Sequence, residues 1–295
     1  MTPDPIPLRR RRTTLEVVGD TFRIVRDDAG QILKAMLPIV AVPIVLNLLV
    51  SYVSGQLDMA FSLDALRGDP EALAQANPMF ANPGWFVLSM VLSLVSSWLI
   101  VSASYAYVVL YQEGETDELT PAALWAATKP LLGPIAGLTI SVVLAYLCVI
   151  LLGIIPCLGA IASLVITVWA LPVLMMLPSA RVFDAHSTKE AFGRVRGLIK
   201  GEWGQSFGTA LVFFLALMAF GIVLFLVIGA VAAVLKSVAV VLLALVSSVL
   251  SVWFYVAFAV AGTLMYFNLL ELEGPELDER VDEIGIDADD EQPLF

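Results

Sequence analysis

Six long apolar runs determine what this chain can fold into. A helix needs about 20 predominantly apolar residues to cross the hydrocarbon core of a bilayer, and each run is long enough. The runs cover residues 32–53, 85–111, 131–155, 157–177, 207–235 and 238–270. The sequence therefore predicts an all-α fold, a polytopic membrane helical bundle with six transmembrane helices.

The composition agrees with a membrane protein. Hydrophobic residues make up 59% and charged residues 15% of the chain, against about 45–50% and 25% in soluble domains. The formal net charge of -11 arises largely from carboxylates that follow Leu270. We expect three parts: a basic N-terminal tail at 1–12, a six-helix transmembrane domain at 13–274 and an acidic cytoplasmic tail at 275–295.

The basic residues predict the orientation, because Lys and Arg are retained on the cytoplasmic side of a membrane. If both termini are cytoplasmic, only Arg67 and Lys236 lie outside. The residues then inside are Arg9 to Arg12, Arg23, Arg26, Lys34, Lys129, Arg181, Lys189, Arg194, Arg196, Lys200 and Arg280. We expect a multi-pass protein with both termini in the cytoplasm.

A short lead-in segment precedes the first, third and fifth apolar runs, and each begins with a helix-capping pattern. Glutamate follows Thr13 and Ser187 by three residues, which is the capping-box spacing. Thr120 is followed by Pro121, a residue favoured at the first helical position. Three cytoplasmic, interfacial amphipathic helices are predicted, and with the hairpin after each they suggest a threefold internal repeat.

The even-numbered runs share a weaker pattern that supports the repeat. The stretches are "SLVSSW", "SLVITVW" and "ALVSSVLSVW", and each ends at a tryptophan. Serine, valine and leucine are common in any transmembrane helix, so chance similarity is the alternative explanation.

Polar residues within the runs leave two interpretations open. Intramembrane charges usually mark proton or ion paths, and none lies centrally in these runs. The neutral polar residues are Asn47, Tyr105, Tyr107, Thr139, Tyr146, Thr167 and Tyr255. We expect them to bond between helices. The alternative is that they line a cavity for a neutral or amphiphilic solute. Helices broken at proline would also indicate such a transport site.

Signals of catalysis are absent from the sequence. His186 is the single histidine, so neither a histidine-rich metal site nor a Ser-His-Asp triad can be assembled. The chain also lacks a Walker-type glycine loop, a GxSxG elbow and an HExxH pair. We expect no enzymatic activity, no catalytic residues, no metal site and no cofactor.

The lead-in "STKEAFGRVRGLIKGEW" from Ser187 to Trp203 is the strongest candidate for a functional site. On a helix of about 3.6 residues per turn, one face carries apolar side chains and the edge of the opposite face carries cations. The apolar residues are Phe192, Val195, Leu198, Ile199 and Trp203, and the cations are Lys189, Arg196 and Lys200. Such a helix is suited to the membrane interface.

Glycines at 193, 197, 201 and 204 lie beside these cations. Each interior glycine costs a helix about 1 kcal/mol relative to alanine, so the strip requires an explanation. Either another helix approaches closely, or the bare backbone admits an anionic phosphate between the cations. The candidate lipid-headgroup residues are Lys189, Gly193, Arg194, Arg196, Gly197, Lys200 and Gly201.

Both ends of the chain resemble a known group. The stretch "RRRRTTLEVVGDTFRIVRDDAGQILKAMLPIVAVPIVL" and the closing "YFNLLELEGPELDERVDEIG" resemble uncharacterised bacterial six-helix membrane proteins, similar to the membrane domain of membrane-anchored glycerophosphodiester phosphodiesterases. The best-defined part comprises Tyr266 to Asn268, Glu273, Gly274, Leu277, Arg280, Ile284 and Gly285. We do not expect the catalytic domain of those enzymes in this sequence. The resemblance therefore implies an architecture and a bacterial cytoplasmic (inner) membrane location, and no reaction.

Two functions follow from these observations. The first is a non-enzymatic, lipid-interacting accessory or scaffold protein at the cytoplasmic membrane. Its partners would be membrane lipids, anionic phospholipid above all, and a protein at the cytoplasmic face, with no nucleic acid. The second is a transporter or channel-like protein for a neutral or amphiphilic solute. A cavity lined by Asn47 and the tyrosines would favour the second function.

Overall fold

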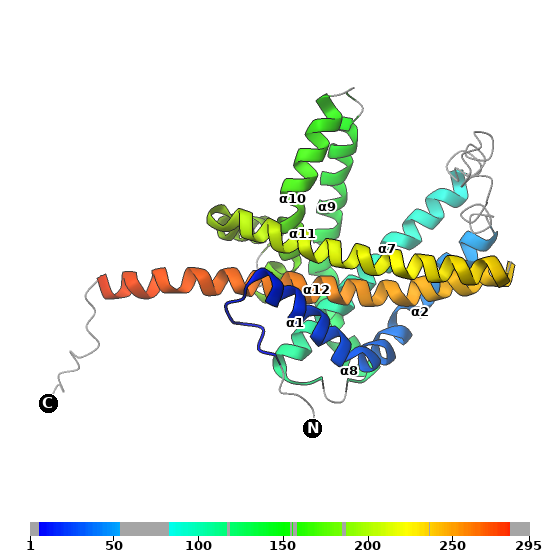
Figure 1. Ribbon diagram of the computed structural model, residues 1–295, viewed down its shortest axis with the longest axis horizontal. Helices are drawn as coiled ribbons and strands as arrows, with labels where there is room; N and C mark the ends of the chain where they lie inside the picture. The colour runs from blue at the N-terminus through cyan, green and yellow to red at the C-terminus, as the bar shows by residue number, and fades with distance from the viewer. Residues whose placement is uncertain are drawn as a thin grey trace.

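The computed structural model describes residues 6–53, 83–116, 119–153, 155, 158–184, 187–235 and 237–283. Every regular element in these ranges is helical (Figure 1). The elements are α1 (Thr14–Asp27), α2 (Ala29–Val53), α7 (Pro83–Glu113), α8 (Pro121–Thr128), η1 (Lys129–Leu131), α9 (Leu132–Gly153), α10 (Leu158–Phe183), α11 (Thr188–Leu235) and α12 (Ser237–Glu283). The predicted all-α class is confirmed.

Six of these helices are long and apolar enough to cross a membrane. The candidate spans are Ala29–Val50, Pro83–Glu113, Pro121–Gly153, Leu158–Phe183, Thr188–Leu224 and Val246–Glu273. Large apolar side chains remain exposed along them, such as Leu151 at 62% and Val223 at 61%. Exposing so much apolar surface to water is unfavourable, whereas exposing it to the hydrocarbon core of a membrane is not. The chain is an integral membrane protein with six spanning helices.

The three predicted caps are present. The backbone N–H of Thr13 donates to Glu16 Oε2 at 2.7 Å and that of Glu16 to Thr13 Oγ1 at 3.4 Å. The N–H and the hydroxyl of Thr13 both donate to Glu16 Oε2, and they hold the pKa of the Glu16 carboxyl below its usual value because they favour the charged form. Thr120 Oγ1 accepts from the N–H of Ala123 at 3.2 Å.

The lead-in helices join their spans through bends in the chain rather than through loops. α1 ends at Asp27, and Asp28, with a φ of -98° and a ψ of 7°, separates it from α2. α8 runs through the 3-10 turn η1 into α9, because Lys129 and Leu132 both keep helical angles. α11 includes its lead-in, with non-helical angles at Glu202 (φ -116°, ψ 25°). Each unit therefore consists of a lead-in helix, a long helix and a returning helix. A bend or a short 3-10 turn joins the lead-in helix to the long helix.

The tryptophans of the even-numbered runs contact the lead-in of the following unit. Trp98 of α7 donates its Nε1 proton to the carbonyl oxygen of Leu132, at the start of α9, at 3.0 Å. Trp169 of α10 lines a cavity with the start of α11, and Trp253 of α12 lines one with α1. The third unit thus contacts the first, because α12 and α11 pack against α1. The threefold repeat stays a prediction.

α12 is the central helix. It contacts α1, α2, α7, α10 and α11, and 56% of its spanning window is buried, against 11–28% in the other spans. At Gly262 a Cβ atom would overlap the carbonyl group of Met175 in α10. Glycine is therefore required where the backbones of α10 and α12 cross. Away from this centre the hairpins diverge, and α9–α10 leaves α11–α12 at a wide angle (Figure 1).

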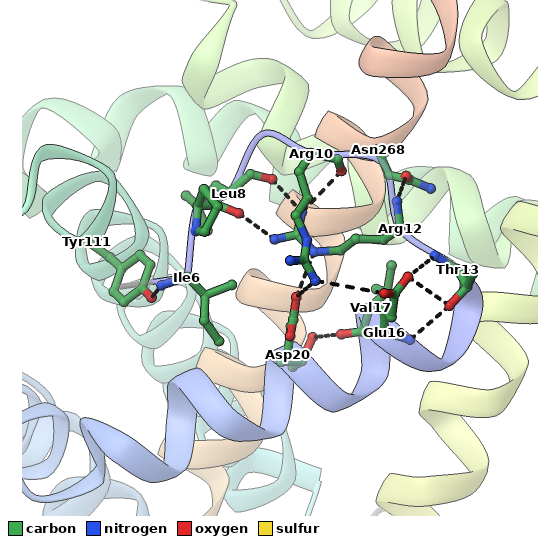
Figure 2. Close-up of polar contacts among 12 residues, drawn as sticks. Ile6, Leu8, Arg10, Arg12, Thr13, Glu16, Val17, Asp20, Tyr111 and Asn268 are labelled. Atoms are coloured by element: carbon green, nitrogen blue, oxygen red, sulfur yellow. Dashed lines mark hydrogen bonds and ion pairs between the residues drawn. The ribbon is translucent and has the colours of Figure 1, made fainter. Parts of the chain in front are cut away.

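Residues 6–12 form a strap that crosses the end of α12 (Figure 2). The Arg12 side chain has no exposed surface, and its Nε donates to Asp20 Oδ2 at 2.8 Å. Its Nη1 donates to the carbonyl oxygen of Leu8 at 2.8 Å, and its Nη2 to that of Pro7. The guanidinium therefore holds the strap in a tight turn against α1.

Candidate functional site

The first part of α11, residues 188–201, carries the candidate residues and is called the basic segment. Its capping box positions it: the N–H of Ser187 donates to Glu190 Oε2 at 2.9 Å, and the N–H of Glu190 to Ser187 Oγ at 3.3 Å. The segment ends at the bend of Glu202. The bend separates its direction from that of the membrane span, which suits a helix lying at the surface.

The apolar face of the basic segment packs against the bundle. Val195 has no exposed surface, Leu198 is 6% exposed and Ile199 is 4% exposed. Phe192 was predicted on the same face, but it is 40% exposed and lies at the edge. The packed side therefore fixes which side of the helix faces outward.

The four candidate cations divide into two groups. Lys189, Arg196 and Lys200 are exposed. They lie seven and four residues apart, so they form one row along the helix. Arg194 is half-buried and pairs with Glu273 of α12 at 2.9 Å between Nη2 and Oε2. Arg194 thus ties the basic segment to α12 and does not belong to the exposed row.

The glycine strip is open. No atom of another helix lies within 4 Å of a Cβ position built on Gly193, Gly197 or Gly201 in the described residues. Among the described residues, no helix packs on the strip. The backbone beside the cations remains accessible.

Two of the cations line a cavity together with two tryptophans. The cavity has a volume of about 210 Å³ and is lined by Trp169, Val173, Arg196, Ile199, Lys200 and Trp203. Trp203 stacks on Phe207 with ring centroids 5.0 Å apart. Its Nε1 is buried and has no hydrogen-bond partner in the described structure. Two positive charges therefore line one cavity, and its wall includes Trp203, whose buried N–H donor is unused.

This arrangement can hold an anion with an apolar attachment. Arg and Lys supply charge and donors for a phosphate, and tryptophans are typical of the boundary between headgroups and hydrocarbon. The sequence identified Arg196, Lys200 and Trp203, but not Trp169. Trp169 lies on α10, and only its place in the repeated Ser-to-Trp pattern indicated it.

The polar residues considered for transport are mostly used between or within helices. Asn47 Nδ2 donates to Ser93 Oγ at 3.0 Å, and Tyr107 Oη donates to Asp28 Oδ2 at 2.7 Å. Thr167 donates to a carbonyl oxygen of its own helix at 2.8 Å. The expected bonding between helices is confirmed for Asn47 and Tyr107. α2 and α10 also continue through their prolines, so neither is a broken helix.

One further cavity lies between α7, α9, α10 and α12. Its volume is about 370 Å³, and Tyr105, Thr139 and Tyr255 contribute to a lining that is otherwise apolar. Asn47 is not part of it. In the described residues, no three His, Cys, Asp or Glu side chains come together as metal ligands would.

Comparisons with protein-family models, with curated proteins and with solved structures found no match. The resemblance to the membrane domain of glycerophosphodiester phosphodiesterases therefore stays a prediction. The fold and the site define the class of the protein as an integral membrane protein with a basic, tryptophan-lined cavity.

The closing motif of that resemblance has a structural role here. The Tyr266 hydroxyl donates to Asp184 Oδ2, and the Phe267 ring lies 4.9 Å from the Arg9 guanidinium. Asn268 Oδ1 accepts from the N–H of Arg12 at 2.6 Å. Three consecutive residues thus join α12 to the end of α10 and to the N-terminal strap.

Proposed function

We propose that the protein is a non-enzymatic accessory or scaffold protein that binds the anionic headgroup of a membrane phospholipid at the cytoplasmic face. Arg196 and Lys200 would neutralise the phosphate, and the Nε1–H of Trp203 would donate to it. The observation that carries the proposal is the cavity that these residues line. The open glycine strip beside it would let a phosphate approach the backbone.

Lys189 and Arg194 have different roles in this proposal. Lys189 is exposed in the same row and adds to the attraction for anionic lipid. Arg194 keeps the basic segment in place through Glu273. Substitution of Arg194 should therefore disturb the structure, and it is unsuitable as a test of binding.

The test is native mass spectrometry of the full chain extracted in mild detergent. Each cation near anionic lipid contributes about 1 kcal/mol, so R196Q together with K200Q should weaken retention about 30-fold. The matched control is K34Q with K129Q, which removes two exposed cations elsewhere. Retention should persist in the control.

Two results would contradict the proposal. Unchanged retention in the Arg196 and Lys200 variant would show that the cavity holds no headgroup. Equal loss in both variants would show that only overall charge matters. A third variant, G197A, is expected to reduce retention without lowering stability, because its methyl group projects into the open strip.

The transport alternative has less support. Among the polar groups on the larger cavity, Thr139 donates to the Ile135 carbonyl oxygen at 2.8 Å and Tyr255 to Ser97 Oγ at 3.2 Å. These two groups already have partners, and the buried Tyr105 hydroxyl is the one polar group among the described lining residues without one. The cavity suits an apolar occupant better.

A further inference from the structure

Two neighbouring cavities adjoin in the bundle. The first is the cavity of about 370 Å³ between α7, α9, α10 and α12, with Leu217 of α11 at its wall. The second, of about 140 Å³, lies between α1, α11 and α12. Leu217 and Phe254 line both, so the cavities adjoin at these two side chains. The two cavities together are called the crevice, and its outer part lies beside α1.

The walls of the crevice are suited to hydrocarbon. Leu138, Val142 and Leu177 line the inner cavity, and Phe220 and Leu250 line the outer one. Thr139 and Tyr255 line it too, with their hydroxyls already bonded to the protein. The Tyr105 hydroxyl is buried and has no hydrogen-bond partner in the described residues, so it is one free polar group on an otherwise apolar wall. Such walls select a ligand mainly by shape and apolar contact.

Polar groups occur at the α1 end of the crevice. Trp253 lines the outer cavity, and its Nε1 is buried without a hydrogen-bond partner in the described residues. Arg26 lines the same cavity; its side chain is 76% exposed and pairs with Asp27. A buried donor without a partner is rare in native structures and calls for an acceptor. The crevice is therefore mainly apolar along its length and polar at one end.

The repeat supplies an independent argument. Trp253 lines a cavity with α1, and Trp169 lines one with α11. In both cases a tryptophan of an even-numbered run lies beside the next lead-in helix. In both places the lead-in contributes a cation, Arg26 in one and Arg196 with Lys200 in the other. The likeness covers two of the three tryptophans, because Trp98 donates to the Leu132 carbonyl oxygen and lines a cavity without a cation.

We propose that the crevice binds the hydrocarbon chain of an amphiphile taken from the surrounding membrane, with an acceptor oxygen of its polar end at Trp253 Nε1 and Arg26. A bilayer-spanning protein is surrounded by such molecules, and their chains match the walls. The shared chemistry is a straight apolar chain with an oxygen-rich head, as in a phospholipid or a free fatty acid. The site is separate from the Arg196 and Lys200 cavity and does not depend on it.

The test is photocrosslinking in vesicles of phosphatidylglycerol and phosphatidylcholine that contain the full chain. One arm uses phosphatidylglycerol with a diazirine on an acyl chain, and the other uses a diazirine fatty acid. Mass spectrometry of the peptides should place crosslinks on Leu138, Val142 and Phe254 in excess over exposed residues such as Leu226. The arm that gives this pattern identifies the source of the chain.

Substitutions make the test decisive. L217W fills the point where the cavities meet and should remove the crosslinks in the crevice, whereas L226W on the exposed side of α11 should not. W253F keeps an aromatic, though smaller, ring and removes the N–H donor, so it should lower labelling by about two- to tenfold, the effect of one hydrogen bond.

R196Q with K200Q should leave crevice labelling unchanged, so this proposal and the headgroup proposal can fail separately. In the contrary outcome, labelling is spread over exposed apolar residues and is equal in the L217W and L226W variants and in both arms. Such labelling would show only contact with the surrounding lipid. That result would overturn the proposal.

Discussion

Arg12 is a fully buried cation in an otherwise apolar bundle. Its partners are Asp20 and main-chain oxygens of the strap, so the charge and its donors are all used. R12Q leaves Asp20 and the carbonyl groups without these donors, and loss of one partner of a buried pair costs about 3–5 kcal/mol. We expect a clearly lower midpoint of thermal unfolding, measured by tryptophan fluorescence in detergent.

The matched control is R10Q, two residues away in the same strap. The Arg10 side chain is 45% exposed, and its ion pairs with Asp20 and Glu16 are 3.3 and 4.0 Å long. Exposed pairs contribute less than about 1 kcal/mol. Equal shifts for the two variants would mean that the strap is not anchored through Arg12.

The sequence could not distinguish these arginines. Residues 9–12 are four consecutive arginines, and local pattern alone predicts a basic tail. The distinction arises because Asn268, 256 residues away, accepts from the Arg12 N–H and places Arg12 inside. For the same reason Trp169, which comes from another helix, was not identified as part of the basic cavity.

At the scale of the elements, two glycines within helices have opposite roles. A methyl group on Gly262 would overlap the Met175 carbonyl in α10, whereas one on Gly197 meets nothing within 4 Å. G262A should therefore separate α10 from α12 and lower the unfolding midpoint. G197A should raise it, because alanine stabilises an exposed helix by about 1 kcal/mol relative to glycine.

Thermal unfolding of the two variants in the same detergent compares these effects directly. A stabilising G262A would show that α10 and α12 do not cross closely at Met175. A destabilising G197A would show that another surface, such as a second copy of the chain, covers the strip. Both variants change glycine to alanine, so intrinsic helix propensity favours each equally.

The helices and their caps can be predicted from local sequence, but the bends and turns that connect the helices cannot. Thr13, Thr120 and Ser187 were each identified because a cap needs only residues three positions apart. The bend at Glu202 and the merging of α8 into α9 depend on how the neighbouring helices pack. Tertiary packing decides such joints, which is why sequence pattern placed the lead-ins but did not show that bends connect them.

At the scale of the whole molecule, the lead-in helices and the polar contacts gather at one end of the spans. α1, α8 and the basic segment precede the three outgoing spans, and α7, α10 and α12 return to the same end. Apolar side chains are exposed toward the other ends of the hairpins, such as Leu158 at 75%. The cations of the lead-in helices therefore lie at one end of the described spans, and the proposed headgroup site requires that this end is on the cytoplasmic side.

Single cysteines test the orientation, in a chain with Cys148 and Cys157 changed to serine. E115C lies exposed after α7, and I155C lies exposed between α9 and α10, at the opposite end of the spans. A membrane-impermeant maleimide added to intact cells should label I155C at once and E115C only after permeabilisation. This follows because retained Lys and Arg hold the lead-ins inside.

The reverse labelling pattern would have consequences beyond topology. It would place Arg196, Lys200 and Arg26 at the outer face and remove the attraction of the anionic cytoplasmic leaflet, which contributes about 1 kcal/mol per cation. The crevice would keep its apolar walls and could still hold a chain. Orientation therefore separates the part of lipid binding that depends on charge from the part that depends on shape.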